Sequence, residues 1–186
     1  MADDRRQALL VLRAQAGDRE ALDELLHRFQ EPLFGYLHRL TGDPELAKDA
    51  LQEVFLLVWR KLRWLRQPEL FRPWCYRIAS RVAFRILRRE RRWSRPMPPD
   101  VPLPERSAEP SLKESDLLEH LPGLLDRVSP ASRAVLVLHY LQEMSLQEVA
   151  DVLGLSLGTA KSRLAYGLAS LRRMIPEQGC AEPMER

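Results

Sequence analysis

The chain has 186 residues, of which 45% are hydrophobic, enough to bury the core of one ordinary domain or two small ones and to exclude disorder throughout. Its two cysteines, Cys75 and Cys180, lie far apart without a Cys/His cluster, which argues against a disulfide scaffold or a zinc site. No stretch approaches the roughly 20 apolar residues of a membrane span, and the first residues lack the apolar run of a secretory signal. We therefore expect a cytoplasmic protein without a metal or cofactor.

The net charge of +3 is unevenly distributed along the chain. Residues 60–95 contain thirteen Arg or Lys and two acids, a net charge of +11, whereas residues 1–59 and 96–186 each carry −4. A basic block this concentrated indicates a polyanionic partner. Nucleic acid is favoured over a membrane surface, which remains the alternative, because the block is rich in arginine and lies in the middle of the chain.

Helical periodicity dominates from the start of the sequence. Residues 9–16 and 21–29 predict two amphipathic helices joined around Gly17. Residues 32–40 predict a third helix, which starts at a proline and ends around Gly42.

A longer helix is predicted from Pro44 to about residue 65, with Asp43 as its N-cap. Residues 54–59 are six apolar residues in a row, although a helix covered on one side needs only an apolar stripe. This helix is therefore either central to the core or in contact with a partner.

The next predicted helix, about residues 68–92, has a buried face and an opposite, basic face. Its buried stripe comprises Phe71, Cys75, Ile78, Val82 and Ile86. Five arginines at steps of three and four, here named the arginine stripe, share the other face: Arg77, Arg81, Arg85, Arg88 and Arg92. Neighbouring like charges repel by a few tenths of a kcal/mol per pair, so the stripe predicts bound phosphates. Trp64 and Phe71 flank the loop just before it, and aromatic rings beside a basic surface can stack on unpaired bases.

Residues 93–110 contain six prolines, which predicts an extended linker. The predicted organisation is all-α, with two small helical domains at 1–92 and 112–176, a linker at 93–111 and a frayed tail at 177–186.

Residues 145–173 predict a helix-turn-helix. Gly154 is suited to end its first helix and Ser156 to cap its second. The polar face of the second helix comprises Thr159, Ser162 and Tyr166, with Lys161 and Arg163 on its flanks. Small polar residues bracketed by cations suit a helix in the DNA major groove; an ordinary helical hairpin with a solvated face is the alternative.

Three segments in order, 43–62, 68–92 and 127–164, resemble the extracytoplasmic-function (ECF) sigma factors, the short two-domain group of the sigma-70 family. They resemble the polymerase-binding helix, the helix that melts and reads the −10 element, and the domain that reads the −35 element. The resemblance covers nearly the whole chain except the linker and tail.

The resemblance implies a role for each segment in core RNA polymerase and promoter binding. Residues expected to dock on the clamp helices of the largest polymerase subunit are Asp49, Gln52, Glu53, Phe55 and Leu56. The loop at 64–69 would capture a flipped base, and Arg77, Arg81, Arg85 and Arg88 would hold the DNA backbone at the −10 element. Thr159, Ser162, Arg163 and Tyr166 would face the −35 element. The linker would thread through the polymerase, and an anti-sigma factor is an expected partner, which would hold the chain at the membrane if it is anchored there.

The chain departs from the family pattern at two places. Arg81 stands where members often have Asn, so the −10 preference is expected to differ. Residues 165–169 replace a run of cations and put Gly167 inside a helix, at a cost of about 1 kcal/mol relative to alanine. A weaker or differently specified −35 contact is expected.

Binding rather than bond-making is predicted, because the sequence has no nucleophile–base pair, metal-ligand cluster or glycine-rich phosphate loop. The scattered residues His27, His38, His120 and His139 are interpreted as structural. Two alternatives are a dimeric transcription regulator with an effector domain, and a sigma-like decoy that only sequesters an anti-sigma factor.

Overall fold

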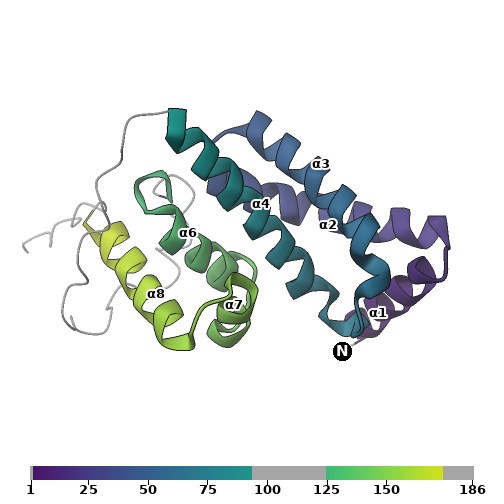
Figure 1. The fold of residues 1–186 in the computed structure, drawn as a ribbon. Coiled ribbons are helices and arrows are strands. Elements are labelled where there is room, and N and C mark those ends of the chain that lie inside the picture. The colour runs from purple at the N-terminus through teal and green to yellow at the C-terminus, as the bar shows by residue number, and fades with distance from the viewer. Residues whose placement is uncertain (1, 94–124, 174–186) are drawn as a thin grey trace, which may run out of the picture.

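The computed structural model describes residues 2–93 and 125–173, and every regular element in these two ranges is a helix. The N-terminal module contains α1 (Ala2–Gln15), α2 (Arg19–Thr41), α3 (Pro44–Lys61) and α4 (Phe71–Trp93). The C-terminal module contains α6 (Pro130–Leu136), a π-helix (Val137–Leu141), α7 (Leu146–Leu153) and α8 (Leu157–Arg172) (Figure 1). Short 3₁₀ helices occupy Leu62–Trp64, Pro68–Leu70 and Leu125–Arg127. The all-α prediction is confirmed; residues 94–111 of the predicted linker, residues 112–124 and the tail lie outside the described residues.

The prediction of two separate helices at 21–29 and 32–40 is wrong, because α2 is continuous through Pro32. A proline inside a helix removes one backbone hydrogen bond and costs about 3 kcal/mol. The continuous helix keeps Phe29, Leu33 and Leu37 on one fully buried face. Burying each such side chain contributes about 1.5–3 kcal/mol, so together they offset the cost of the proline.

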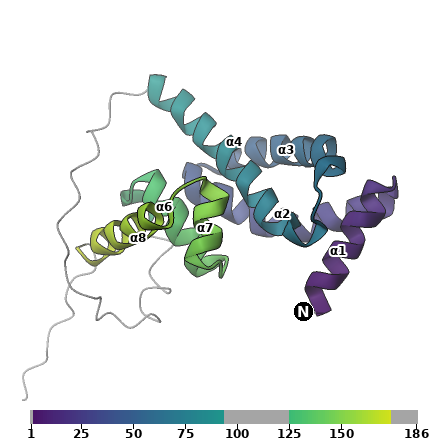
Figure 2. The same ribbon diagram turned by 60° about the horizontal axis from the view of Figure 1, so that its bottom comes forward.

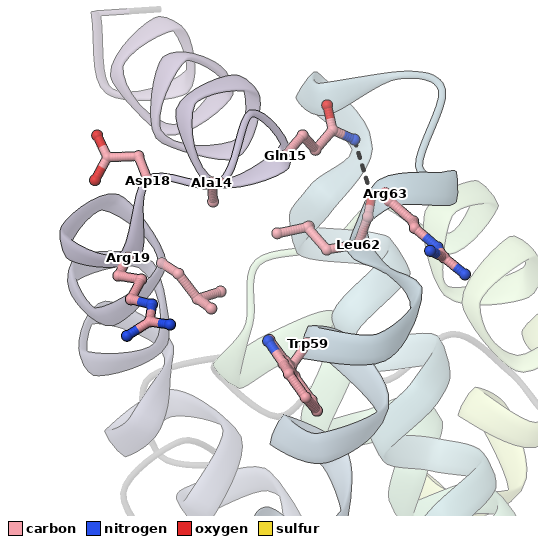
Figure 3. Close-up of a pocket in the computed structure, with 9 residues that line it drawn as sticks. Ala14, Gln15, Asp18, Arg19, Trp59, Leu62 and Arg63 are labelled. Atoms are coloured by element: carbon pink, nitrogen blue, oxygen red, sulfur yellow. Dashed lines mark hydrogen bonds between the residues drawn. The ribbon is translucent and has the colours of Figure 1, made fainter.

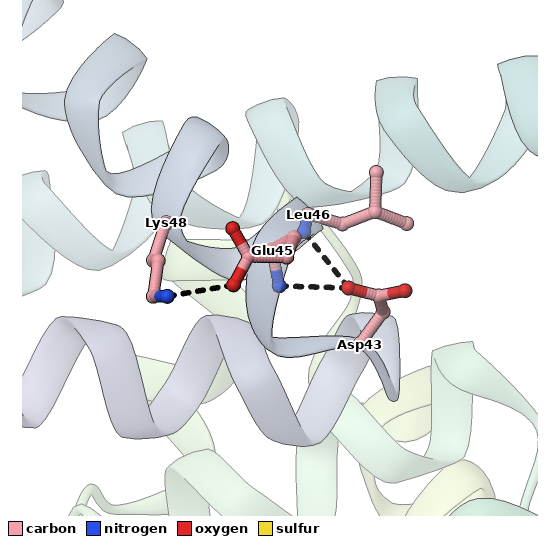
Figure 4. A network of polar contacts seen from close by, with 4 residues as sticks. All are labelled: Asp43, Glu45, Leu46 and Lys48. Carbon is pink, nitrogen blue, oxygen red and sulfur yellow. Dashed lines mark hydrogen bonds and ion pairs between the residues drawn. The ribbon is translucent and has the colours of Figure 1, made fainter.

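Helix α3 begins as predicted, with Asp43 as N-cap and Pro44 in its first turn. The Asp43 carboxylate accepts hydrogen bonds from the backbone N–H groups of Glu45, at 2.7 Å, and Leu46, at 3.1 Å (Figure 4). Lys48 pairs with Glu45 at 2.6 Å one turn further on. The helix ends at Lys61, four residues before the predicted end, and continues as the first 3₁₀ turn.

Helices α2, α3 and α4 enclose the core of the N-terminal module. Its largest fully buried aromatic side chains, Tyr36, Phe71 and Tyr76, come from α2 and α4. The Tyr36 hydroxyl is hydrogen-bonded to Ser80 Oγ at 2.7 Å, which joins the two helices through a buried polar contact. This pairing satisfies groups that would otherwise be buried without a partner.

The predicted helix-turn-helix is present in the C-terminal module. Ser145 and Glu148 form a capping box at the start of α7, and Gly154 ends that helix with a left-handed φ of 67°. Ser156 caps α8 by accepting a hydrogen bond from the Thr159 N–H at 3.1 Å. These caps fix the two helix ends that define the turn between α7 and α8.

The two modules pack against each other. α7 lies against α4, and α6 lies against α2, as both ribbon views show (Figures 1 and 2). Polar contacts between them include Arg72 and Tyr76 of α4 with Gln142, and Arg133 of α6 with the carbonyls of Arg39 and Leu40. Buried apolar side chains of both modules also belong to one core cluster.

Candidate polymerase and nucleic-acid interface

Helix α3 presents an exposed face on the side away from the core. Asp49, Gln52 and Leu56 are exposed and Glu53 is half-buried, at a spacing that places all four on one side of the helix. The same α3 segment explains the run of six apolar residues. Val54 is fully buried, whereas the side chains of Leu56 and Trp59 are 59% and 63% exposed. Core packing therefore accounts for only part of that run, and its exposed part is available to a partner.

Phe55 lies between these two faces. Its side chain is half-buried and packs against the core, so it contributes less to the exposed face of α3 than its neighbours do.

The arginine stripe is on the surface of α4 as far as its side chains are described. Arg77, Arg81, Arg85 and Arg88 are exposed; the Arg92 side chain lies outside the described part of the structure. Two of the four meet acceptors from other elements: Arg85 forms an ion pair with Glu53 of α3, and Arg77 Nε donates to the Asp151 carbonyl at 3.2 Å.

The Arg85–Glu53 ion pair joins the predicted DNA surface to the predicted polymerase surface. The hydrogen bond to Glu53 raises the pKa of Arg85, so this guanidinium stays charged. Because Arg85 is more than half exposed in its side chain, solvent screens the pair, and it is worth little as a stabilising contact. The consequence of the pair is geometric, because Glu53 on α3 and Arg85 on α4 hold each other in position.

Trp64 lies at the end of the first 3₁₀ turn with 70% of its surface exposed. The Arg63 guanidinium lies 4.8 Å from the centre of its ring, a cation–π contact. The loop is fastened from a distant part of the chain. Gln15 Nε2 donates to the Leu62 carbonyl at 2.8 Å (Figure 3) and to the Leu65 carbonyl, also at 2.8 Å.

Phe71 does not share the exposure of Trp64, and the prediction that it stacks on bases is corrected. It is fully buried, and its ring meets Phe29 edge-to-face with centroids 5.1 Å apart. Phe71 is the first residue of α4, where the helix turns its apolar stripe towards the core, so the ring belongs to the core.

A shallow hollow lies between α1, the start of α2 and the end of α3 (Figure 3). Its lining residues are Ala14, Gln15, Gly17, Asp18, Arg19, Leu22, Trp59, Leu62 and Arg63. The hollow extends the exposed side of α3 towards the Trp64 loop.

Helix α8 carries the predicted DNA-reading side chains. Thr159, Lys161 and Ser162 are exposed, whereas Arg163 and Tyr166 are half-buried. The Thr159 hydroxyl is also within 2.8 Å of Ser156 Oγ, so the cap orients it. The first two turns of α8 therefore present an exposed polar surface that contains Thr159, Lys161 and Ser162.

Comparison with known proteins agrees with this arrangement. Residues 25–93 match the family model for sigma-70 region 2, and residues 124–173 match that for sigma-70 region 4. The chain is 30% identical over 187 residues to the RNA polymerase sigma factor NccH of Alcaligenes xylosoxydans xylosoxydans, covering 94% of this chain and 97% of that protein. This chain belongs to the ECF group of the sigma-70 family.

Other relatives of this sigma factor are similarly distant. It is 31% identical over 163 residues to the ECF RNA polymerase sigma factor SigE of Mycolicibacterium smegmatis, of whose length it spans 63%. It is 29% identical over 165 residues to CarQ of Myxococcus xanthus, covering 89% of this chain and 95% of that one.

Solved structures share its fold. CnrH, in complex with the cytosolic domain of CnrY, superimposes with a TM-score of 0.69 at 22% identity, over 94% of this chain and 99% of that one. RpoE of Bartonella quintana, in complex with the anti-sigma factor NepR, gives 0.65 at 17% identity, over 84% and 98%.

Sequence reasoning missed two positioning contacts in this sigma factor. Gln15 fastens the Trp64 loop from about 50 positions away, and no local pattern marks it. Glu53 was expected to meet only polymerase, yet it also neutralises Arg85 of the stripe. Opposite charges on two adjacent amphipathic helices were the only available signal for that pair.

The histidines that the structure describes show no clustering. His139 Nδ1 lies 2.7 Å from the Met144 carbonyl, and His38 stacks on Phe34. Among the described residues, no group of three or more His, Cys, Asp or Glu could hold a metal ion, and no helix is long and apolar enough to cross a membrane. His120 and Cys180 lie outside the described residues.

Proposed function

We propose that this sigma factor binds core RNA polymerase through the exposed face of α3 and directs initiation at specific promoters from the cytoplasm. The arginine stripe of α4 holds DNA of the melted −10 element, and the first turns of α8 read the −35 element. The polymerase performs the chemistry, and the sigma factor itself is not an enzyme.

The observation that carries the proposal is the juxtaposition of α3 and α4. These helices lie side by side in the N-terminal module and present two chemically different surfaces. The surface of α3 is acidic and apolar, with Leu56 at its centre, whereas that of α4 carries exposed guanidinium groups and only one acid, Glu90. One suits a protein partner and the other a phosphate backbone.

Promoter opening then needs no catalytic residue. Melting costs on the order of 1.4 kcal/mol for each stacked base-pair step. Stacking a flipped base on an aromatic ring returns about 1–3 kcal/mol, and backbone contacts add to it. Trp64, with one side of its ring near Arg63, is an exposed aromatic group in the segment that leads into α4.

An anti-sigma factor is the partner we propose for control of this chain. RpoE of Bartonella quintana, which shares the fold, was solved with the anti-sigma factor NepR. A membrane-anchored factor of this kind would hold the chain at the membrane.

Run-off transcription with purified core polymerase tests the function, and charge reversal tests the stripe. Arg81→Glu combined with Arg88→Glu leaves the Arg85–Glu53 pair intact. We expect this variant to bind core polymerase normally but to lose the permanganate reactivity of the melted promoter region. Arg5→Glu combined with Arg127→Glu, two exposed arginines on α1 and on the 3₁₀ helix Leu125–Arg127, changes the net charge equally and should initiate normally.

Substitution of an exposed leucine tests the polymerase surface. Leu56→Ser on α3 should weaken co-elution with core polymerase. The control Leu9→Ser lies on α1 at 58% exposure, against 59% for Leu56, and should not change co-elution. A wild-type chain that neither co-elutes nor directs initiation, yet binds an anti-sigma factor, would support the decoy alternative instead.

A further inference from the structure

One side chain of α1 brackets the residue that we propose to stack on an unpaired base. Gln15 is the last residue of α1, and its Nε2 donates to the Leu62 carbonyl and to the Leu65 carbonyl, each at 2.8 Å (Figure 3). A side-chain amide has two N–H groups, so both are used on this loop. The two acceptors lie on either side of Trp64 in the chain. Gln15 therefore fixes the backbone from which the Trp64 ring projects.

The turn that carries Trp64 is a weak support by itself. It is a single 3₁₀ turn, in which the Leu65 N–H donates to the Leu62 carbonyl at 3.0 Å. Hydrogen-bond geometry in 3₁₀ helices is poorer than in α-helices, and such turns are short for that reason. The Trp64 ring is largely exposed, and the Arg63 guanidinium near its face belongs to the adjacent residue of the same turn. The direction of the ring thus depends on how well the backbone at 62–65 is held.

Gln15 is itself held by the turn between α1 and α2. Gly17 has a φ of 97°, a left-handed conformation that glycine adopts without strain. Asp18 then caps α2 by accepting a hydrogen bond from the Ala21 N–H at 3.1 Å, and it pairs with Arg13 of α1 at 2.6 Å. Helix α1 also packs against both 3₁₀ turns of the loop. The Gln15 amide is therefore presented to the loop from an ordered support.

This support lies outside the part of the chain that the family model describes. The match to sigma-70 region 2 begins at residue 25, after α1 and the turn that follows it. The loop that α1 supports, at 62–70, lies inside the match.

We propose that Gln15 is a positioning residue for promoter opening, which holds the loop at 62–65 in the conformation that lets Trp64 stack on a flipped base. This rests on the proposed function, since it takes Trp64 as the stacking residue. Gln15 acts through the loop and does not contact the base. A loop that is ordered beforehand avoids the cost of ordering on binding. Without Gln15 the binding conformation is populated for only part of the time, and the affinity for the base falls by that fraction.

Gln15→Met removes the two hydrogen bonds with little other change. Methionine is unbranched and of similar length, has no N–H donor, and leaves the net charge of the chain unchanged. Gln30→Met makes the same chemical change on the exposed surface of α2 and is the matched control.

Hydrogen exchange measured by mass spectrometry on the full chain reports the order of the loop. A hydrogen bond is worth a factor of about two to ten in an equilibrium constant. We expect peptides that cover residues 62–70 to exchange about two- to tenfold faster in Gln15→Met than in wild type or Gln30→Met. Unchanged exchange of α2, α3 and α4 in the same samples shows that the module remains folded.

A double-mutant cycle between Gln15 and Trp64 separates positioning from general support of the fold. The readout is the affinity of the full chain for a mixed-sequence single-stranded 30-nucleotide DNA, since stacking on an aromatic ring tolerates any base. Trp64→Ala should weaken binding about fivefold or more. Gln15→Met should weaken it about two- to fivefold when Trp64 is present. Once residue 64 is alanine, Gln15→Met should have little further effect, because the two residues serve one contact.

Two results would overturn the role of Gln15 alone. One is an equal loss of affinity from Gln15→Met with and without Trp64, which shows that Gln15 supports the fold rather than the stacking contact. The other is a chain in which Gln15→Met changes neither the exchange of the loop nor the affinity, although Trp64→Ala weakens binding. A Trp64→Ala chain that binds as tightly as wild type would instead refute the base contact in the proposed function, and the role of Gln15 with it.

Discussion

Gly167 offers a sharp test of how α8 is held against α6. A Cβ atom added at this position would lie 2.8 Å from Leu136 Cδ1, 3.2 Å from Leu136 Cγ and 3.4 Å from Ser132 Cβ. Leu136 is fully buried, and side chains in protein interiors are closely packed, so moving it disturbs its neighbours. Glycine at 167 therefore permits a close approach of two helices that alanine would obstruct.

Two opposing effects decide the sign of Gly167→Ala. Alanine in place of glycine stabilises a helix interior by about 1 kcal/mol. An extra methyl group in a packed core costs about 1–3 kcal/mol. With a 2.8 Å contact to a buried leucine, the packing cost should exceed the gain, so we expect a net destabilisation of about 1 kcal/mol.

Gly158→Ala in the first turn of the same helix is the matched control. Its added Cβ would meet only Ser156 Oγ, at 3.9 Å, which is ordinary contact. The helix propensity term then acts alone and stabilises α8 by up to about 1 kcal/mol. Native-state hydrogen exchange of α8 peptides in the full chain measures both changes locally, whether or not the two modules unfold together.

The opposite sign for the two variants is the expected outcome. Equal gains in exchange protection for Gly167→Ala and Gly158→Ala would refute the packing argument. That result would mean that α6 and α8 separate by a few tenths of an ångström at little cost, and that Gly167 is no more than a weak point in the helix.

Three further measurements test the N-terminal module. Tyr36→Phe removes the buried hydrogen bond to Ser80 and should lower the free energy of unfolding in urea by about 1 kcal/mol. Hydrogen bonds from the Ala21 N–H and Arg13 lower the pKa of the Asp18 carboxyl. The contribution of Asp18 to stability is therefore complete above the ordinary carboxyl pKa of about 3.9 and is lost as the pH falls through the lowered pKa. Asp18→Ala should lower Tm at neutral pH, and the variant should lose less stability than wild type on acidification. Burial raises the pKa of the Cys75 thiol, so in a Cys180→Ser chain it should react with a disulfide reagent only as fast as the module opens.

Local chemistry in the sequence predicted the helix ends well. Asp43, Gly154 and Ser156 were assigned from residue type and position alone, and each caps the helix it was assigned to. A cap is decided within about four residues, so no distant part of the chain is needed to predict it. The continuous α2 shows the limit of such rules, because the burial of Leu33 and Leu37 outweighs the local penalty of Pro32.

The exposure of aromatic side chains was less predictable than helix ends. Trp64 and Phe71 flank the same basic loop, although Phe71 also begins the predicted buried stripe of the helix that follows. Phe71 is buried because it begins α4 and meets Phe29 from α2, a contact across 42 positions. Trp64 lies on a 3₁₀ turn whose position depends on Gln15, which no local pattern identifies.

The arginine stripe shows what helical spacing can and cannot establish. Spacing placed Arg77, Arg81, Arg85 and Arg88 on one exposed face, and their mutual repulsion implied anions opposite them. The free chain supplies two substitutes for phosphate, the Glu53 carboxylate at Arg85 and the end of α7 at Arg77. These two acceptors lie on α3 and α7, and the spacing of residues along α4 cannot predict which other helices pack beside it. Because Glu53 also belongs to the proposed polymerase surface, we expect a polymerase contact that engages its carboxylate to release Arg85 for DNA, which would link core binding to promoter binding through this ion pair.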